Sequence, residues 1–170
     1  HDWAKYDTGT DEGSASQTTY SAGANYHIIP RKFVVYGSVS TGFEPTTRRD
    51  PNTGQVLKNR ESFGGEIGFK GVLFDGAFSY SGAIFQIEEA NQTTDNPLNP
   101  GGVDPDLPAL IPGATTRARG INLDATGRIT ENLPILGNIS WTDARIVEHA
   151  SDPALIGTRP KGTPTVPPRT

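Results

Sequence analysis

The chain has 170 residues, of which 34% are hydrophobic, with 20 Gly, 14 Pro, no Cys and a formal net charge of −4. That apolar fraction is low for a water-soluble domain, in which about 45–50% apolar residues, Gly included, is usual. The lack of Cys excludes a disulfide framework, a thiolate zinc site and a cysteine nucleophile. The acidic balance gives no basic patch of the kind that binds nucleic acid, and no apolar stretch approaches the roughly 18 residues of a spanning helix.

Along the chain, the polar and aperiodic opening at residues 1–17 predicts a loop. After it, apolar and polar residues alternate in segments that predict strands, and helical periodicity is nowhere convincing. The alternation is clearest where Ile121, Leu123, Ala125 and Ile129 are interleaved with polar residues, because successive side chains of a strand point to opposite faces. The six predicted strands cover residues 19–28, 33–43, 62–71, 76–88, 115–130 and 133–142.

The connections between these strands alternate in length. Short links at residues 29–32, 72–76 and 130–132 alternate with long polar loops at residues 44–61, 89–115 and 148–170. A transmembrane β-barrel has this arrangement, with short periplasmic turns, long extracellular loops, apolar residues towards lipid and polar residues towards the interior. The pattern therefore predicts an all-β fold, a segment of an antiparallel transmembrane β-barrel. A soluble β-sheet with one wet face is the alternative.

Aromatic residues lie near the strand ends, which is typical of the girdles at the two membrane interfaces. The alternation in residues 76–88 is imperfect and changes parity near Ile84 and Phe85. The predicted girdle residues are Tyr26, Phe33, Phe69, Phe74 and Phe78 on the short-turn side, and Phe43, Phe63, Phe85 and Trp141 on the long-loop side.

Five motifs in order resemble the strands of TonB-dependent outer-membrane receptors of the siderophore-receptor type, in the carboxy-terminal part of their barrel. They are "YGSVSTGFEP" (36–45), "GEIGFKG" (65–71), "AIFQI" (83–87), "RARGINLDATGRIT" (117–130) and "ISWTDARI" (139–146). Two positions depart from the family pattern, Asn122 in place of Glu and Trp141 in place of Tyr. We therefore carry no detailed residue role over from the family.

The resemblance implies that residues 1–170 are part of a single β-barrel domain. Barrels of this class have about 22 strands and a plugged lumen, so the six strands predicted here form a fraction of the wall. The chain starts at His1 without a signal peptide and stops in the loop-like "PTVPPRT". We therefore expect a piece of a longer chain, with the plug domain, the TonB-binding motif and the final strands outside it.

The resemblance further implies active transport of a scarce ligand, a ferric siderophore in first place, across the outer membrane of a Gram-negative bacterium. The expected partners are outer-membrane lipid, the ligand, and the TonB complex, which would act through the amino-terminal region outside this chain. We expect no enzymatic activity, no cofactor and no nucleic-acid partner. A passive porin-like channel and a soluble β-rich binding or adhesion module are the alternative functions.

Two groups of residues are candidates for sites. An anionic ligand would be attracted by loop cations, and the predicted ligand-binding residues are Arg48, Arg49, Lys58 and Arg60. Charged residues on the polar strand faces are interpreted as lining a wet lumen rather than as catalytic pairs, and the predicted lumen-facing residues are Glu66, Lys70, Asn122, Asp124 and Arg128. The three His residues are far apart in sequence, which predicts no metal site, and "DPNTG" (50–54) is a turn rather than a calcium loop.

Overall fold

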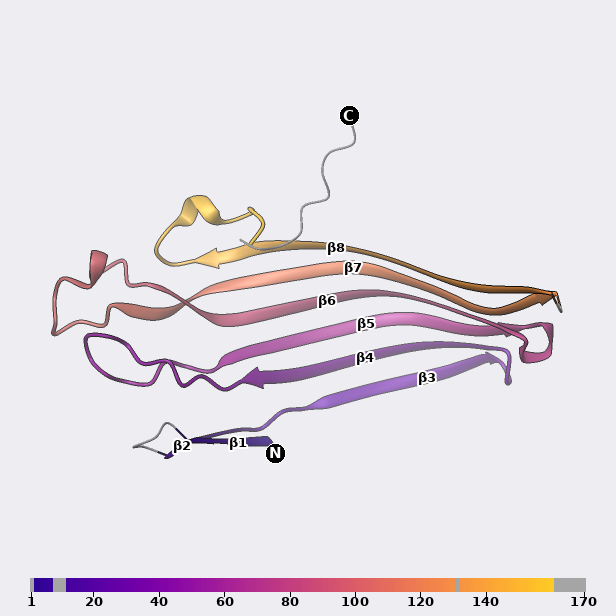
Figure 1. Ribbon diagram of the computed structural model, residues 1–170, viewed down its shortest axis with the longest axis horizontal. Coiled ribbons are helices and arrows are strands. Elements are labelled where there is room, and N and C mark those ends of the chain that lie inside the picture. Colours follow the sequence, from indigo (N-terminus) through magenta and orange to yellow (C-terminus); the bar gives the residue numbers. More distant parts are fainter. Residues whose placement is uncertain (1, 8–11, 131, 161–170) are drawn as a thin grey trace.

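The computed structural model describes residues 2–7, 12–130 and 132–160. Within these residues the strands form a two-stranded sheet and a six-stranded main sheet, whose order is β3-β4-β5-β6-β7-β8. Each strand of the main sheet pairs antiparallel with its neighbour in sequence, so the sheet is a meander (Figure 1). Its strands are β3 (Ser21–Ile29), β4 (Phe33–Glu44), β5 (Arg60–Leu73), β6 (Phe78–Asp95), β7 (Leu110–Thr130) and β8 (Leu133–His149).

The prediction of a loop at residues 1–17 is wrong for the part that the structure describes. β1 (Asp2–Asp7) and β2 (Glu12–Gln17) form an antiparallel pair, in which Trp3 lies opposite Ser16. Pairing satisfies the backbone N–H and C=O groups that point from each strand towards the other and does not depend on apolar alternation. The two strands therefore pair without the apolar alternation on which the sequence prediction relied.

The strands on either side of the second long loop are also longer than predicted. β6 continues to Asp95 and β7 begins at Leu110, so the predicted loop at residues 89–115 contracts to residues 96–109. The register shifts between Glu89 and Gln92, where Asn91 adopts a φ of 61°. An inserted residue of this kind interrupts the alternation of side chains while the backbone ladder continues on both sides. The sequence pattern therefore ends before the strand does.

The alternation of short and long connections is confirmed. The β3–β4, β5–β6 and β7–β8 turns lie at one end of the main sheet and the long loops at the other (Figure 1). In the first turn, the Lys32 amide donates to the Ile29 carbonyl at 3.0 Å, and Arg31 takes a φ of 61°. The helices of the described residues are three short 3₁₀ segments, η1 (Phe74–Gly76), η2 (Pro100–Gly102) and η3 (Pro153–Leu155), and none is long enough to cross a membrane.

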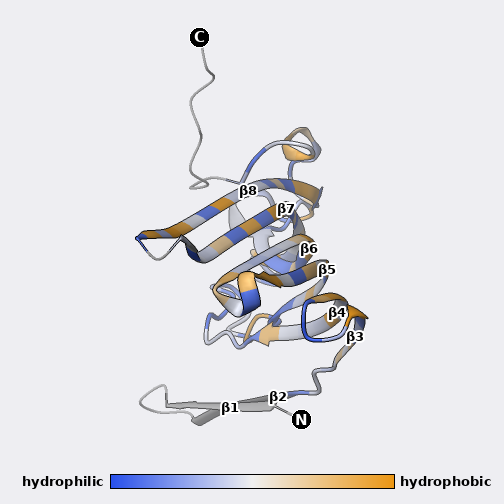
Figure 2. Ribbon diagram, turned by 90° about the vertical axis from the view of Figure 1, so that its right-hand side faces the viewer, coloured by the Kyte–Doolittle hydropathy of each residue, from blue (hydrophilic) through white to orange (hydrophobic). Residues whose placement is uncertain are grey.

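The register assigns each strand residue to one of two faces, because directly opposite residues in an antiparallel pair share a face. Ile67, Ile84, Ile121 and Trp141 form one continuous row across β5 to β8. We call the side that carries this row the apolar face and the opposite side the polar face. The alternation of the two chemistries is visible along β7 and β8 (Figure 2). The apolar face includes Tyr26, Val35, Val39, Ile67, Phe69, Ile84, Ile121, Leu123, Ile139 and Trp141.

The apolar face has no protein layer over it. Ile67 is 66% exposed, Ile139 68% and Trp141 58%, and the buried apolar core of the described residues consists of Ala114 alone. A contiguous exposed apolar surface of this extent is rare on soluble monomers and marks a contact with another protein or a membrane. The stabilising environment of this face therefore lies outside the chain.

Phe85 does not belong to an outward girdle, in contrast to the prediction. Its partners across the sheet are Glu66 and Gly120, so its ring lies on the polar face. The ring occupies the space that a Cβ atom on Gly120 would need. On the apolar face, near the short turns, Phe33, Phe69 and Tyr80 do form a cluster, with ring centroids 6.0 to 6.5 Å apart.

Candidate ligand site at the long-loop end

The first long loop, residues 45–59, is organised around the carboxylate of Asp50. Its Oδ1 accepts hydrogen bonds from the amides of Asn52 at 3.1 Å and Thr53 at 2.9 Å, and from the Thr53 hydroxyl at 3.1 Å. Gly54 closes the turn with a φ of 68°. This arrangement is the turn that the sequence predicts, because Asp side chains in turns bond the backbone two residues on.

The same carboxylate fastens this loop to the second one. Asp50 is 2% exposed, and its Oδ2 accepts the Leu110 amide at 2.7 Å. Burial is the largest influence on the pKa of Asp50 and raises it, but the hydrogen bonds from Thr53, Leu110 and Asn52 together outweigh burial and lower the pKa below its ordinary value. Asp50 is therefore ionised at neutral pH and stabilises the junction in that form.

Two Asn side chains complete the junction. The Asn52 amide nitrogen lies 3.0 Å from the Gly102 carbonyl, 2.8 Å from that of Asp104 and 3.1 Å from that of Leu107. Asn99, 2% exposed, donates to the last two carbonyls at 2.9 and 3.0 Å. The two loops thus share a buried polar core, in which side chains replace the backbone ladder that ends at Asp95 and Leu110.

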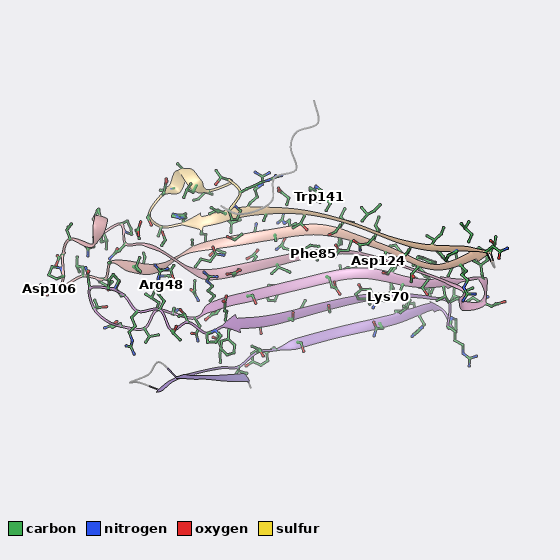
Figure 3. All side chains as sticks on the ribbon, in the orientation of Figure 1. Arg48, Lys70, Phe85, Asp106, Asp124 and Trp141 are labelled. Carbon is green, nitrogen blue, oxygen red and sulfur yellow. The ribbon has the colours of Figure 1, made fainter. Side chains whose placement is uncertain are left out.

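A polar cavity of about 490 Å³ lies between the first long loop, the long-loop ends of β6, β7 and β8, and the loop that follows β8. Arg48, which lies among the long loops in Figure 3, lines it from the first loop, Asp95 from the end of β6, and His149 and Asp152 from the end of β8 and the following loop. The Asp152 amide donates to His149 Nδ1 at 3.1 Å, which leaves the Nε2 side of the imidazole for other contacts. The cavity combines cationic and anionic groups, which suits a small polar ligand.

The structure does not gather the four predicted ligand-binding residues into one site. Arg48 lines the cavity, Arg49 donates through Nη1 to the Gly54 carbonyl at 3.0 Å, and Lys58 is exposed on the same loop. Arg60 begins β5, where its guanidinium lies 3.5 Å from a Glu44 oxygen and 3.4 Å from a Glu89 oxygen. The charge of Arg60 is therefore largely balanced by these carboxylates. The described residues contain no group of three or more His, Asp or Glu side chains placed to hold a metal ion.

The predicted lumen-facing residues all lie on the polar face. Lys70 and Asp124 lie in one row, because both are opposite Ser81, and Asn138 continues the row on β8. The Asp124 carboxylate accepts hydrogen bonds from the Ser81 hydroxyl and the Asn138 amide, and Lys70 Nζ lies 4.9 Å from the centre of the Tyr36 ring. The polar face is thus a hydrogen-bonded surface.

The remaining three follow the same pattern. The Asn122 side chain accepts the Ser140 hydroxyl at 2.7 Å, and Glu66 lies opposite Ser38. Arg128 lies opposite Pro134 on β8, and its backbone amide donates to the Ala77 carbonyl at 2.8 Å, close to the short turns. In Figure 3, Lys70 and Asp124 lie nearer to the short turns, whereas Arg48 and Asp106 lie among the long loops.

One feature of the polar face was missed by the site prediction. Phe85 and Ile87 form an apolar pair there, next to a cavity of about 390 Å³ that Glu66 and Asn122 also line. The change of parity near Ile84 and Phe85 was the signal in the sequence, since an apolar residue that breaks the alternation must point to the other face.

The whole chain, residues 1–170, matches the family model "TonB dependent receptor-like, beta-barrel". The chain belongs to this family. As a TonB-dependent receptor barrel segment, it is similar to the ferrichrome outer membrane transporter/phage receptor of Escherichia coli K12, with 26% identity over 96% of this chain and 21% of the relative. It is also similar to the metal-pseudopaline receptor CntO of Pseudomonas aeruginosa, with 28% identity over 81% of this chain and 19% of the relative.

Solved structures of receptors agree with the fold. The alcaligin outer-membrane receptor FauA of Bordetella pertussis has a TM-score of 0.65 at 26% identity, over 79% of this chain and 23% of that one. The ferripyoverdine receptor of P. aeruginosa has a TM-score of 0.67 at 24% identity, over 80% of this chain and 18% of that one. The TonB-dependent receptor segment thus spans about a fifth of its relatives' length. We assign it to the outer membrane of a Gram-negative bacterium.

Proposed function

We propose that the whole receptor takes up a chelated metal, a ferric siderophore in first place, with energy supplied through TonB. The observation that carries this proposal is the match of the entire chain to the TonB-dependent receptor barrel. The relatives above 25% identity are named as a ferrichrome transporter, a metal-pseudopaline receptor and an alcaligin receptor. Residues 1–170 belong to a single barrel domain in this proposal, and the plug and the TonB-binding motif are provided by the rest of the receptor.

In this proposal the apolar face contacts lipid, and Glu66, Lys70, Asn122, Asp124 and Arg128 line the lumen. Two facts support these roles. The apolar residues are exposed without a protein layer, whereas the polar face is cross-linked by side-chain hydrogen bonds. Strands of a transmembrane barrel require this division of chemistry.

Arg48 is the proposed ligand contact, because it lines the polar cavity at the long-loop end of the sheet. Arg49 and Lys58, on the same loop, add positive potential that attracts an anionic chelate. Arg60 is proposed to hold the start of β5 through its two carboxylate partners and to act on the ligand only indirectly.

The test is uptake in iron-starved cells that lack the chromosomal gene for the full receptor. Cells with the wild-type gene restored should accumulate radiolabelled iron from ferrichrome or another ferric siderophore, and deletion of TonB should abolish this accumulation. Accumulation that persists without TonB would support a passive channel and contradict the proposal.

Arg48 is tested in the same cells. Arg48→Gln should raise the KM for the ferric siderophore several-fold, with a larger effect at low ionic strength, because screening weakens exposed charges. Arg31→Gln, in the short turn between β3 and β4 at the opposite end of the sheet, is the control and should leave KM unchanged. An unchanged KM for Arg48→Gln would remove this residue from the ligand site.

A further inference from the structure

The polar cavity at the long-loop end of the sheet is lined by charged side chains of both signs, among them Arg48, Asp95 and Asp152. Of the described residues, none forms an ion pair with the Arg48 guanidinium or with the Asp95 carboxylate. By contrast, Arg60 and Arg145, at the same end of the sheet, both have carboxylate partners. Opposite charges that share a cavity without pairing remain available to a ligand.

Hydrogen bonds hold the two carboxylate residues in neighbouring positions. The Ser151 hydroxyl donates to the Asp95 carbonyl at 2.6 Å and also contacts the Thr94 hydroxyl. Asp152 is the next residue, about 3.8 Å further along the chain. Its Oδ1 accepts the Ala154 amide at 3.0 Å, which leaves Oδ2 for a ligand. The cavity therefore presents carboxylate oxygens from both residues.

The cavity is negative overall. One guanidinium and two carboxylates line it, which gives a formal charge of −1 with His149 counted as neutral. The sum becomes −2 when three charged neighbours of the lining residues, Arg49, Asp50 and Glu148, are included. Lys58, further along the first loop, brings the sum back to −1. A single arginine therefore does not make the cavity suitable for a ligand that is anionic throughout.

We propose that the cavity binds a ligand with a free ammonium group, which Asp95 and Asp152 hold while Arg48 contacts an anionic group of the same ligand. This inference rests on the proposed function and narrows the ligand to ferric chelates that carry an amine. An ammonium group has three N–H donors, so it can donate to both carboxylates at once. Such charge-assisted hydrogen bonds are roughly twice as strong as neutral ones. Acetylation of the amine removes the charge.

The arrangement selects by repulsion as well as by attraction. A chelate whose amine is acetylated leaves both carboxylates without a cationic partner, and an anionic group in that place meets like charge. Arg48 and the Nε2 side of His149 lie in the same cavity and are available to the anionic part of the ligand. The cavity thus has separate places for the two charges of one ligand.

The test uses the full receptor, purified in a non-ionic detergent, and two forms of one chelate. Ferrioxamine B ends in a free amine, and in N-acetylferrioxamine B that amine is an amide. Ferrioxamine B should bind at least tenfold more tightly than its acetyl derivative, or by about 1.4 kcal/mol. Asp95→Asn combined with Asp152→Asn should weaken the binding of ferrioxamine B at least tenfold and leave the affinity for the acetyl derivative unchanged.

Asp106→Asn is the matched control, because Asp106 lies among the same long loops but does not line the cavity (Figure 3). It should leave both affinities unchanged. The Asp152→Asn side chain retains an acceptor for the Ala154 amide, so the loop after β8 keeps this contact. Thermal unfolding of each variant verifies that the barrel has folded.

Equal affinity for the two forms of ferrioxamine B, or binding of neither form, would overturn the proposal. A double variant that keeps the wild-type preference for the amine would overturn it as well, because Asp95 and Asp152 would then not be the ligands. TonB-dependent uptake of a ferric siderophore is measured separately. Uptake combined with equal affinity for the two forms refutes only this inference, whereas a preference for the amine without uptake refutes only the transport function.

Discussion

A series of arginine substitutions along β7 tests how deeply each residue of the apolar face lies in the membrane. The variants are Ile121→Arg, Leu123→Arg and Ala125→Arg on the apolar face, and Thr126→Arg on the polar face. The strand runs for ten residues from the start of the apolar band at Ile121 to its end at Thr130, both included. They rise about 33 Å along the strand, which at the tilt of a membrane barrel matches an apolar band about 25 Å tall.

The expected costs follow from these depths. Ile121 lies at the outer edge of the band, Leu123 about 5 Å below the edge and Ala125 about 10 Å below it, close to the midplane. Arginine on the lipid face costs about 2–4 kcal/mol at the midplane and about 0–1 kcal/mol at the interface. We therefore expect about 0–1 kcal/mol at Ile121, about 1–2 kcal/mol at Leu123 and about 2–4 kcal/mol at Ala125. Thr126→Arg should cost less than about 1 kcal/mol, because the lumen is wet.

The assay is equilibrium unfolding of the full receptor in liposomes by guanidinium, followed by tryptophan fluorescence, with the free energy of unfolding compared among the variants. The order of the costs is the decisive result. A flat profile across the three apolar-face positions, or equal costs at Ala125 and Thr126, would refute the assignment of the faces.

Three further predictions concern packing and the loop junction. Gly120→Ala should lower the free energy of unfolding by about 1–3 kcal/mol, because its Cβ would overlap the Phe85 ring, whereas Gly137→Ala, with open space around it, should change the free energy little. Asn52→Ala should make the long loops more sensitive to protease, because three loop carbonyls lose a donor. The lowered pKa of Asp50 means that its contribution is complete above the ordinary carboxyl range and is lost as pH falls through the folded pKa. Protease resistance of the wild-type loops should therefore be constant down to about pH 4 and fall below it, while Asp50→Asn should be sensitive at every pH.

The sequence predicts the strands and their faces wherever the ladder is regular. Apolar and polar residues alternate without interruption from Ile121 to Thr126, and the register confirms their faces. The prediction stops where bulges begin, as at Asn91, because an inserted residue shifts every later side chain to the other face. Beyond the bulge the two strands still pair through their backbone hydrogen bonds, and the alternation of apolar residues does not indicate this pairing.

The loop junction could not be predicted, because its contacts join distant segments. Asn52 bonds carbonyls more than 50 residues away, and Asp50 bonds the Leu110 amide. Asp and Asn in a turn have a local explanation in their own backbone, so nothing in the sequence distinguishes a local turn from a junction between loops. The pairing of Arg117 with Arg145 and of Arg119 with Asp143 could not be predicted for a related reason, since these residues become neighbours only through the β7–β8 register.

The most direct test of the central claim compares two adjacent residues of β8 in the full receptor. Ile139 lies on the apolar face and is 68% exposed, whereas Ser140 lies on the polar face and donates to Asn122. A spin label is placed at one or the other position in liposomes, and its relaxation is measured with molecular oxygen, which concentrates in lipid, and with a water-soluble nickel complex. We predict that oxygen dominates at Ile139 and the nickel complex at Ser140. The same accessibility at both positions would contradict a barrel wall with lipid on one side and water on the other.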